Sequence, residues 1–182
     1  MKKQFFSSGE WVMIPFLVLF GFATRLLPHP ANFTPIGALA LFGAMYLPKR
    51  FAVILPLGAM LVSDVFIGFY DWRIMLAVYA SFCLMGCIGL LIRKRKTMLT
   101  VGIGTLSGSL LFFFITNAAV WAFGTMYAHT LAGLEASYIA AIPFFRNSAL
   151  GDVCYVALLV GGFETVKSLV RLKGAKLQAI SV

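Results

Sequence analysis

Long uncharged runs separated by short polar or charged breaks dominate the chain. The clearest run covers Ile74–Ile92, nineteen residues without a charge, and it ends in four consecutive cations, Arg93–Lys96. At about 1.5 Å rise per residue, a helix of this length spans about 28 Å, close to the hydrocarbon thickness of a bilayer. The pattern predicts a membrane-spanning helix over 74–92.

The same pattern predicts five further helices, one for each remaining uncharged run, over 10–27, 36–47, 51–69, 98–123 and 151–170. The run over 36–47 covers only about 18 Å, so its helix must be tilted, broken or shielded by its neighbours. The expected fold class is an all-α integral membrane protein, a single domain over 1–182 with six transmembrane helices.

Two connections stand out between the predicted helices. Pro28–Pro35 holds three prolines in eight residues, which predicts an extended and rather rigid loop. Residues 124–150 are aromatic and half-polar, and we predict an irregular outer segment with a short interfacial helix around Leu134–Ile142. A connection of this length is unusual unless it has a role of its own.

Composition strengthens the membrane assignment. The 182 residues are 61% hydrophobic and only 12% charged, whereas a soluble domain carries about 25% charged residues. The 17 glycines suit close helix packing. The apolar runs are too continuous for the alternating segments of a β-barrel.

The net charge of +9 is distributed unevenly on this topology. Twelve of the 15 Lys and Arg fall beside one set of helix ends, and only Arg25, Arg73 and Arg146 fall beside the other. Cations flanking membrane spans are retained on the cytoplasmic side. This predicts a multi-pass protein of a bacterial inner membrane with both termini cytoplasmic. The charge then reflects topology and contact with the lipid bilayer rather than nucleic acid.

Polar residues in membrane helices are costly and require an explanation. On the predicted topology they gather in the outer half and the outer loops, which indicates a substrate pocket open to the outside. The candidate substrate-binding residues are His29, Asn32, Asp64, Asp71, Tyr79, Asn117, Trp121, Tyr138, Arg146, Asn147, Asp152 and Tyr155. Simpler explanations stay open: the two membrane acids pair with Arg25, Arg73 or Arg146, Asn117 bonds between helices, or His29 is solvated.

Three cysteines make no disulfide framework, and buried free cysteine usually serves packing. Cys83 lies one helical turn below Tyr79 on the same face, at the expected depth of the pocket floor. A thiolate there is a soft ligand for a late first-row metal, although packing is the simpler explanation for Cys83, Cys87 and Cys154. Hydrolase, metalloprotease and nucleotide-binding motifs are missing from the sequence.

Several stretches, taken together, resemble the small six-helix substrate-binding S-components of energy-coupling-factor (ECF) vitamin transporters. They are RLLPHPANFTPIGALALFGA, the Ser63–Asp64 pair, VYASF at Val78–Phe82, FFFITN (the pattern FFxxTN) ending at Asn117, and AIPFFRNSALGD ending at Asp152. The similarity runs over nearly the whole chain. Within that group the chain is most similar to the solitary cobalamin transporters of the BtuM type.

The resemblance implies an S-component-like bundle that binds vitamin B12 from outside and takes it up across the inner membrane. It implies that a cysteine ligates the cobalt of the bound corrinoid, Cys83 first and Cys87 as the fallback. His29, Asp71, Tyr79 and Arg146 would then contact the corrin side groups. The resemblance also implies removal of cyanide from cyanocobalamin, in which Cys83 would be the catalytic residue.

One departure from the family pattern bears on partners. S-components that dock on a shared ECF energising module show Ala-x-x-x-Ala on helix one, which FLVLFGFATR lacks; Ala40 and Ala44 have that spacing on the next helix. This argues against docking on a standard module and favours the solitary type. The alternatives are an S-component for another vitamin or precursor, with Cys83 as packing, and a structural membrane subunit without transport function.

Overall fold

The computed structural model describes the backbone of residues 8–180 and the side chains of residues 13–172. Within that range the regular structure is entirely helical. The helices are α1 (Ser8–Leu26), α2 (Ile36–Tyr46), α3 (Phe51–Ile67), α4 (Trp72–Ile92), α5 (Met98–Phe123), α6 (Leu131–Val156), the π-helical turn η1 (Ala157–Gly161) and α7 (Gly162–Ile180). The all-helical prediction is confirmed for the described residues, and the predicted bounds of the first five helices agree with the observed ones to within a few residues.

Local sequence signals set the helix ends. The Asp71 carboxylate accepts hydrogen bonds from the backbone N–H groups of Arg73 and Ile74, so it caps the start of α4. Thr97 and Thr100 form a reciprocal capping box at the start of α5. Gly68 ends α3 with a positive φ of 108°, which only glycine adopts at low cost.

The short helix α2 is the centre of the bundle. Ten of its residues, Ile36–Met45, are buried, and α2 packs against α1, α3, α4, α5 and α6. Glycines make this packing close: a Cβ on Gly43 would stand 2.7 Å from the Phe51 carbonyl oxygen, and one on Gly89 2.9 Å from that of Leu41. The sequence left open whether this short helix is tilted, broken or shielded by its neighbours, and the structure shows it shielded.

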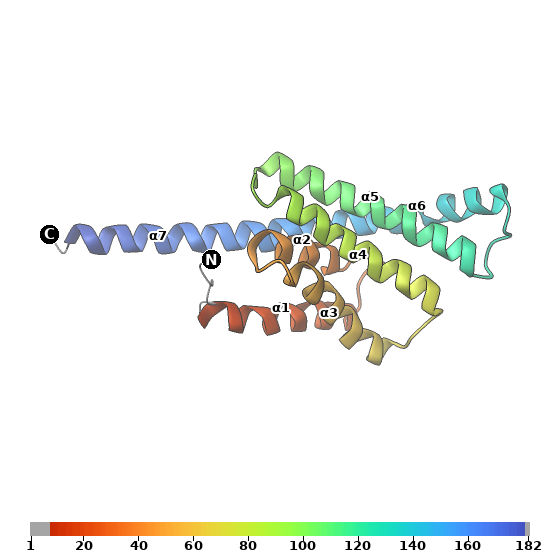
Figure 1. Cartoon of the computed structure of the whole chain (residues 1–182), viewed down its shortest axis with the longest axis horizontal. Coiled ribbons are helices and arrows are strands. Elements are labelled where there is room, and N and C mark those ends of the chain that lie inside the picture. The colour runs from red at the N-terminus through yellow and green to blue at the C-terminus, as the bar shows by residue number, and fades with distance from the viewer. Residues whose placement is uncertain (1–7, 181–182) are drawn as a thin grey trace.

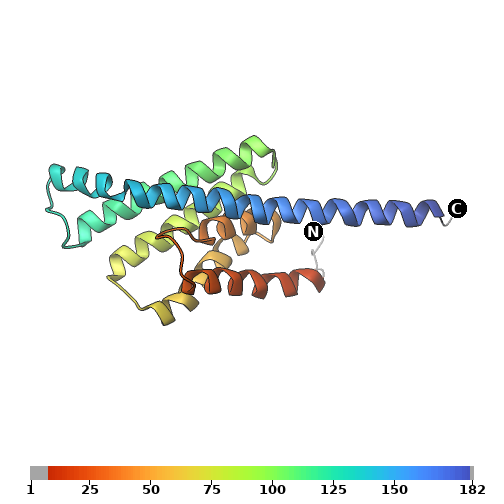
Figure 2. The same cartoon turned by 180° about the vertical axis from the view of Figure 1, so that it is seen from behind.

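The short helix predicted around Leu134–Ile142 is helical, but the irregular structure predicted for the rest of 124–150 is wrong from Leu131 onwards, because one continuous helix begins there. Thr130 caps a helix by accepting from the Gly133 N–H, and α6, η1 and α7 continue as one rod that runs past the rest of the bundle (Figure 2). The polar residues of this segment support the helix: Ser137 Oγ donates to the Asn117 carbonyl and Tyr138 Oη to that of Phe114. The mixed polar and apolar composition of residues 131–150 therefore belongs to a helix that packs on α5 along one face and is exposed along other faces.

Three helical stretches are long and apolar enough to cross a membrane, namely Trp72–Ile92, Met98–Phe123 and Leu131–Leu172. Shorter apolar helices cover Met13–Leu26, Ile36–Tyr46 and Phe51–Ile67. These lengths and compositions suggest a membrane protein.

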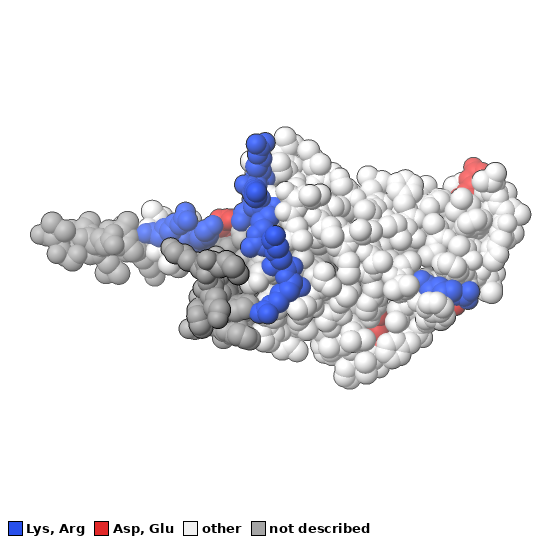
Figure 3. Space-filling view, viewed as in Figure 1, with Lys and Arg blue, Asp and Glu red and all other residues white. Residues whose placement is uncertain are grey.

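Charge is segregated along the bundle. A band of Lys and Arg crosses it at the end from which α7 projects (Figures 1 and 3). We call this the basic end; its described side chains are Lys49, Arg50, Arg93–Lys96, Lys167 and Arg171. The side chains of Lys2, Lys3, Lys173 and Lys176, which the topology prediction also used, lie outside the described residues.

Candidate ligand-binding site

A cavity of about 350 Å³ lies at the end of the bundle away from the basic end. The loop between α1 and α2 folds over it: Asn32 adopts a left-handed conformation (φ 63°), and Phe33 packs against Gly151 of α6. Exposed His29, Asn32 and Tyr70 border its mouth. The remaining lining residues are Arg25, Thr34, Gly37, Met60, Ile67, Val78, Phe82, Phe112, Ser148 and Asp152.

A second cavity of about 200 Å³ adjoins the first, and the two share Asn32, Val78, Phe112 and Ser148. It lies between α4, α5 and α6 and is largely aromatic, with Phe113, Phe144 and Phe145 in its wall beside Thr116 and Asn117. Together the two cavities offer a polar compartment and an aromatic compartment side by side.

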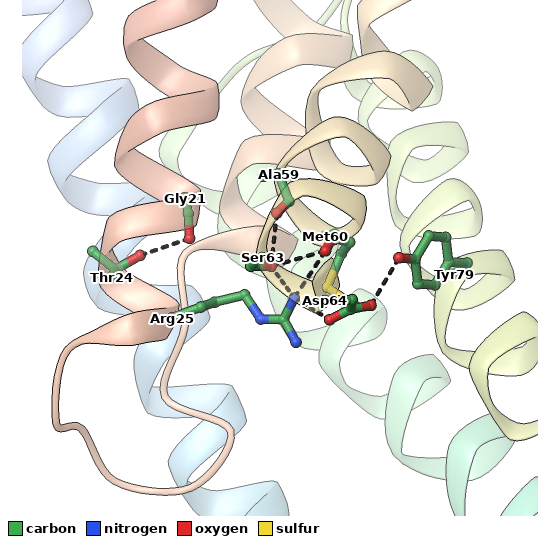
Figure 4. Close-up of polar contacts among 8 residues, drawn as sticks. All are labelled: Gly21, Thr24, Arg25, Ala59, Met60, Ser63, Asp64 and Tyr79. Atoms are coloured by element: carbon green, nitrogen blue, oxygen red, sulfur yellow. Dashed lines mark hydrogen bonds and ion pairs between the residues drawn. The ribbon is translucent and has the colours of Figure 1, made fainter. Parts of the chain in front are cut away.

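Arg25, Asp64 and Tyr79 bring three helices together behind the polar compartment (Figure 4). Arg25 Nη1 of α1 donates to Asp64 Oδ1 of α3 at 2.7 Å and to the Met60 carbonyl at 3.3 Å, and it also contacts Ser63 Oγ. Tyr79 Oη of α4 donates to the other Asp64 oxygen at 2.8 Å. Both oxygens of this carboxylate therefore have a donor.

The Arg25–Asp64 ion pair is well shielded, since the side chains are 15% and 1% exposed. Removing one member of a shielded pair leaves an uncompensated charge, which typically costs about 3–5 kcal/mol. The pair confirms one of the simpler explanations given for Asp64, and its first role is to join α1 to α3.

Asp152 of α6 is also buried, with 5% of the residue exposed, but its surroundings are different. Ser109 Oγ of α5 lies 2.7 Å from Asp152 Oδ2. The Asp152 Oδ1 faces Gly37, so closely that a Cβ there would stand 2.3 Å from it. The salt bridges among the described side chains are Arg25–Asp64, Arg73–Asp71 and Lys167–Glu164, so Asp152 belongs to none of them.

Tyr70 in the α3–α4 loop borders the mouth of the larger cavity. Partial burial, and after it the charge of Asp64, raise the pKa of Tyr70 to about 12, with the positive charge of Arg25 opposing them. The phenol is therefore neutral at physiological pH and can donate a hydrogen bond.

Five of the predicted substrate-binding residues gather at the two cavities or directly behind them. His29, Asn32 and Asp152 line the larger cavity, Asn117 lines the smaller one, and Asp64 contacts the cavity-lining Arg25. Tyr79 stands on the far side of Asp64.

The other predicted residues lie outside both sets of lining residues. Asp71 caps α4, while Trp121 Nε1 donates to the carbonyls of Ala128 and Thr130 and closes the α5–α6 turn. The Tyr155 ring packs 5.5 Å from that of Phe33. The remaining three, on α6, are Tyr138, Arg146 and Asn147.

The cysteines also lie outside the lining residues. Cys83 is half-buried, while Cys87 and Cys154 are exposed. On α4 it is Val78 and Phe82 that reach the cavity, and the Met85 methyl group lies against Gly37 and Gly108. Among the residues that the structure describes, no cluster of three or more His, Cys, Asp or Glu could hold a metal ion. Ligation of cobalt by Cys83 or Cys87 stays a prediction.

Sequence reasoning missed Ser148, Tyr70 and Phe112 as cavity residues. A signal for Ser148 was present, since Ser148 and Asp152 are four residues apart and share a face if one helix contains both. The predicted helix began at residue 151, so this relation was hidden. Arg25 was considered only as a membrane-interface residue and as an ion-pair partner.

These features define a class, an all-helical apolar bundle with a polar cavity at the end opposite a basic band. The family model described as "Family of unknown function (DUF6580)" matches residues 6–175, and the chain belongs to this family. No curated protein and no solved structure matches the chain.

Proposed function

We propose that the protein is an S-component-like membrane subunit that binds a small molecule from the outer side and serves its uptake. The observation that carries this proposal is the polar cavity opening away from the basic end. Lys and Arg beside membrane spans are retained in the cytoplasm, so the cavity would face outward.

The long rod formed by α6, η1 and α7 has the length that one crossing of the membrane requires. Lys167 belongs to the basic end, and Arg146 precedes it by 21 residues. At about 1.5 Å per residue the two cations are about 32 Å apart, which matches one hydrocarbon thickness. On this basis both termini would be cytoplasmic, as the sequence predicts, in a multi-pass protein of the inner membrane.

The size of the cavities favours a small substrate. The larger cavity, of about 350 Å³, is at the lower end of the range of about 300–1,000 Å³ that small-molecule sites occupy. This volume suits a small vitamin or precursor, the alternative to cobalamin in the sequence analysis, with Cys83 as a packing residue. It is the function that the geometry supports best.

Uptake of cobalamin is the second candidate. It rests on the sequence resemblance and on the position of Cys83, which adjoins the cavity-lining Phe82 along α4. Binding a corrinoid would require the helices to move apart and bring the thiol into an enlarged cavity.

The small-molecule proposal is tested by retention. Purified full-length protein in detergent is incubated with a mixture of water-soluble vitamins and their precursors and then washed, and the retained compound is identified by mass spectrometry. Ser148→Trp, which fills the junction of the two cavities, should abolish retention. Ser107→Trp, on an exposed position of α5, should leave it unchanged. Equal retention by both variants, or none by the wild type, would contradict the proposal.

The cobalamin candidate has a separate test in the absorbance spectrum. Protein mixed with cyanocobalamin and washed should retain the corrinoid, with a spectrum that changes in Cys83→Ala if this thiol ligates cobalt, and in Cys87→Ala if the fallback is correct. Retention with the same spectrum in both variants would exclude ligation by these thiols, and no retention would exclude the substrate. Loss of the cyanide ligand during incubation would be the sign of decyanation.

A further inference from the structure

The charges around the polar compartment do not balance. Arg25 is the cationic lining residue within the wall, and its charge is already matched by Asp64 at 2.7 Å. Asp152 adds a second carboxylate with a serine hydroxyl as its polar partner. His29 stands at the exposed mouth, where its Nδ1 donates to the Leu27 carbonyl. The compartment therefore carries one uncompensated acid when Asp152 is ionised.

An acid in this position requires a partner. Burial of an ionised carboxylate without a counter-charge is unfavourable, and membrane surroundings increase the cost. Ser109 offers Asp152 one hydrogen bond and no charge. Its single hydroxyl proton is also within reach of the Thr105 carbonyl at 3.1 Å. Either a proton or a cationic group from outside must complete the site.

Asp152 belongs to the wall of the larger cavity and packs closely on Gly37. Gly37 has no side chain, and a Cβ at this position would meet both Asp152 Oδ1 at 2.3 Å and the Met85 methyl group at 2.6 Å. Gly37 and Asp152 both line the cavity. A ligand group would therefore reach Asp152 from the cavity side, while its Oδ2 accepts from Ser109 of α5.

The adjoining compartment indicates what the rest of the ligand looks like. Phe112 belongs to both cavities, and Phe113, Phe144 and Phe145 continue the aromatic wall. Aromatic faces attract flat apolar groups and also cations. No Lys lines either cavity among the described residues.

We infer that the ligand is a small organic cation with an aromatic or flat apolar portion. Its ammonium or amidinium group donates to Asp152, and its ring lies among the phenylalanines of the second cavity. This inference rests on the proposed function and names the substrate class of the same site. Anionic ligands are disfavoured, because they would face Asp152 while the charge of Arg25 is already committed to Asp64.

The test uses three probes that share one ring and differ in charge: tryptamine (cation), tryptophol (neutral) and indole-3-acetate (anion). Each is titrated into full-length protein in detergent at up to millimolar concentration, with calorimetry and thermal shift as readouts. Tryptamine should bind about tenfold or more tightly than tryptophol, since a hydrogen bond to a charged partner is much the stronger. Indole-3-acetate should bind most weakly. This ranking needs no variant.

Asp152→Asn should reduce the affinity for tryptamine about tenfold and remove its advantage over tryptophol. Glu135→Gln is the matched control, because Glu135 is an exposed acid on the same helix and outside both cavities. It should leave all three affinities unchanged.

Two failures can be told apart. If tryptophol or indole-3-acetate binds as tightly as tryptamine, or if Asp152→Asn keeps the preference, the cavity binds ligands but the inferred substrate class is wrong. If none of the probes binds and the vitamin mixture yields no retained compound, the proposed function fails together with the inference.

Discussion

The two buried carboxylates of this bundle, Asp64 and Asp152, are 1% and 5% exposed and yet are satisfied in opposite ways. Asp64 has a guanidinium on one oxygen and a phenol on the other. Asp152 has a single serine hydroxyl. The first arrangement is electrically complete and joins three helices. The second is incomplete, and it stands at the wall of a cavity.

This contrast indicates how the role of a buried acid in an apolar protein can be inferred from its partners. A carboxylate whose charge is cancelled within the chain contributes to the assembly of the helices, and nothing further is needed to explain it. A carboxylate left without a counter-charge must find one in a ligand or a proton, so it points to function. Both acids looked alike in the sequence.

The largest effect is expected from breaking the complete site. Arg25→Met keeps much of the side-chain volume but leaves the Asp64 charge without its cation. The free energy of unfolding should fall by about 3–5 kcal/mol, as measured by denaturant titration in mixed micelles. Arg73→Met is the control, since Arg73 pairs with Asp71 at the exposed surface, and its effect should be far smaller. Similar losses in both variants would contradict the shielded pair.

A smaller effect is expected from crowding the incomplete site. In Gly37→Ala the new Cβ would stand 2.3 Å from Asp152 Oδ1, so the carboxyl group or the helix must shift. Overpacking of this kind costs about 1–3 kcal/mol. Gly102→Ala has the opposite expected sign: its Cβ meets open space, and alanine is favoured over glycine in a helix by up to about 1 kcal/mol. The same micelle titration compares the two.

Removing the charge of the incomplete site should hardly affect stability. Asp152→Asn keeps an acceptor for the Ser109 hydroxyl and removes an uncompensated charge. The free energy of unfolding should change by less than about 1 kcal/mol, or rise. A loss as large as that of Arg25→Met would show that Asp152 has a cationic partner after all, and it would remove the contrast between the two sites.

The last effect appears only at high pH. The pKa of Tyr70 is raised from 10.0 to about 12 by partial burial and by the nearby Asp64 charge. Because the unfolded chain loses this proton first, the contribution of Tyr70 to stability is fully present below pH 10 and is lost as the pH rises toward 12. Tyrosinate absorbance, compared between wild type and Tyr70→Phe, reports the titration. If Tyr70 ionised at its ordinary pKa of 10.0, it would not sense the charge of Asp64, and this prediction would be wrong.

Sequence patterns predicted the helical class and much of the helix positions. Uncharged runs flanked by charges mark helices strongly, so α5 was predicted with its observed bounds, 98–123. Only a short helix was predicted within Leu131–Leu150, where the helix is continuous, because polar and aromatic residues interrupt the apolar run. Their polar groups bond to α5, a contact between segments about 20 residues apart that periodicity does not reveal.

The candidate site was predicted in part for the same reason. Polar residues expected near the outer end did include His29, Asn32 and Asp152. Sequence patterns could not reveal that Tyr155 and Trp121 serve packing and turn closure, or that Phe82 rather than Cys83 reaches the cavity. Neighbouring positions on a helix differ by about 100° in direction, and the orientation of α4 depends on the helices against which it packs.

By itself, the sequence determined that this chain is an apolar helical protein with its cations gathered beside one set of helix ends, because hydropathy and charge are properties of segments. Helix packing decides which acid has a cationic partner. Arg25 and Asp64 are 39 residues apart, and Ser109 and Asp152 are 43 apart. Which of the two carboxylates is neutralised depends on how α1 packs on α3 and how α5 packs on α4 and α6, and no local pattern specifies those contacts.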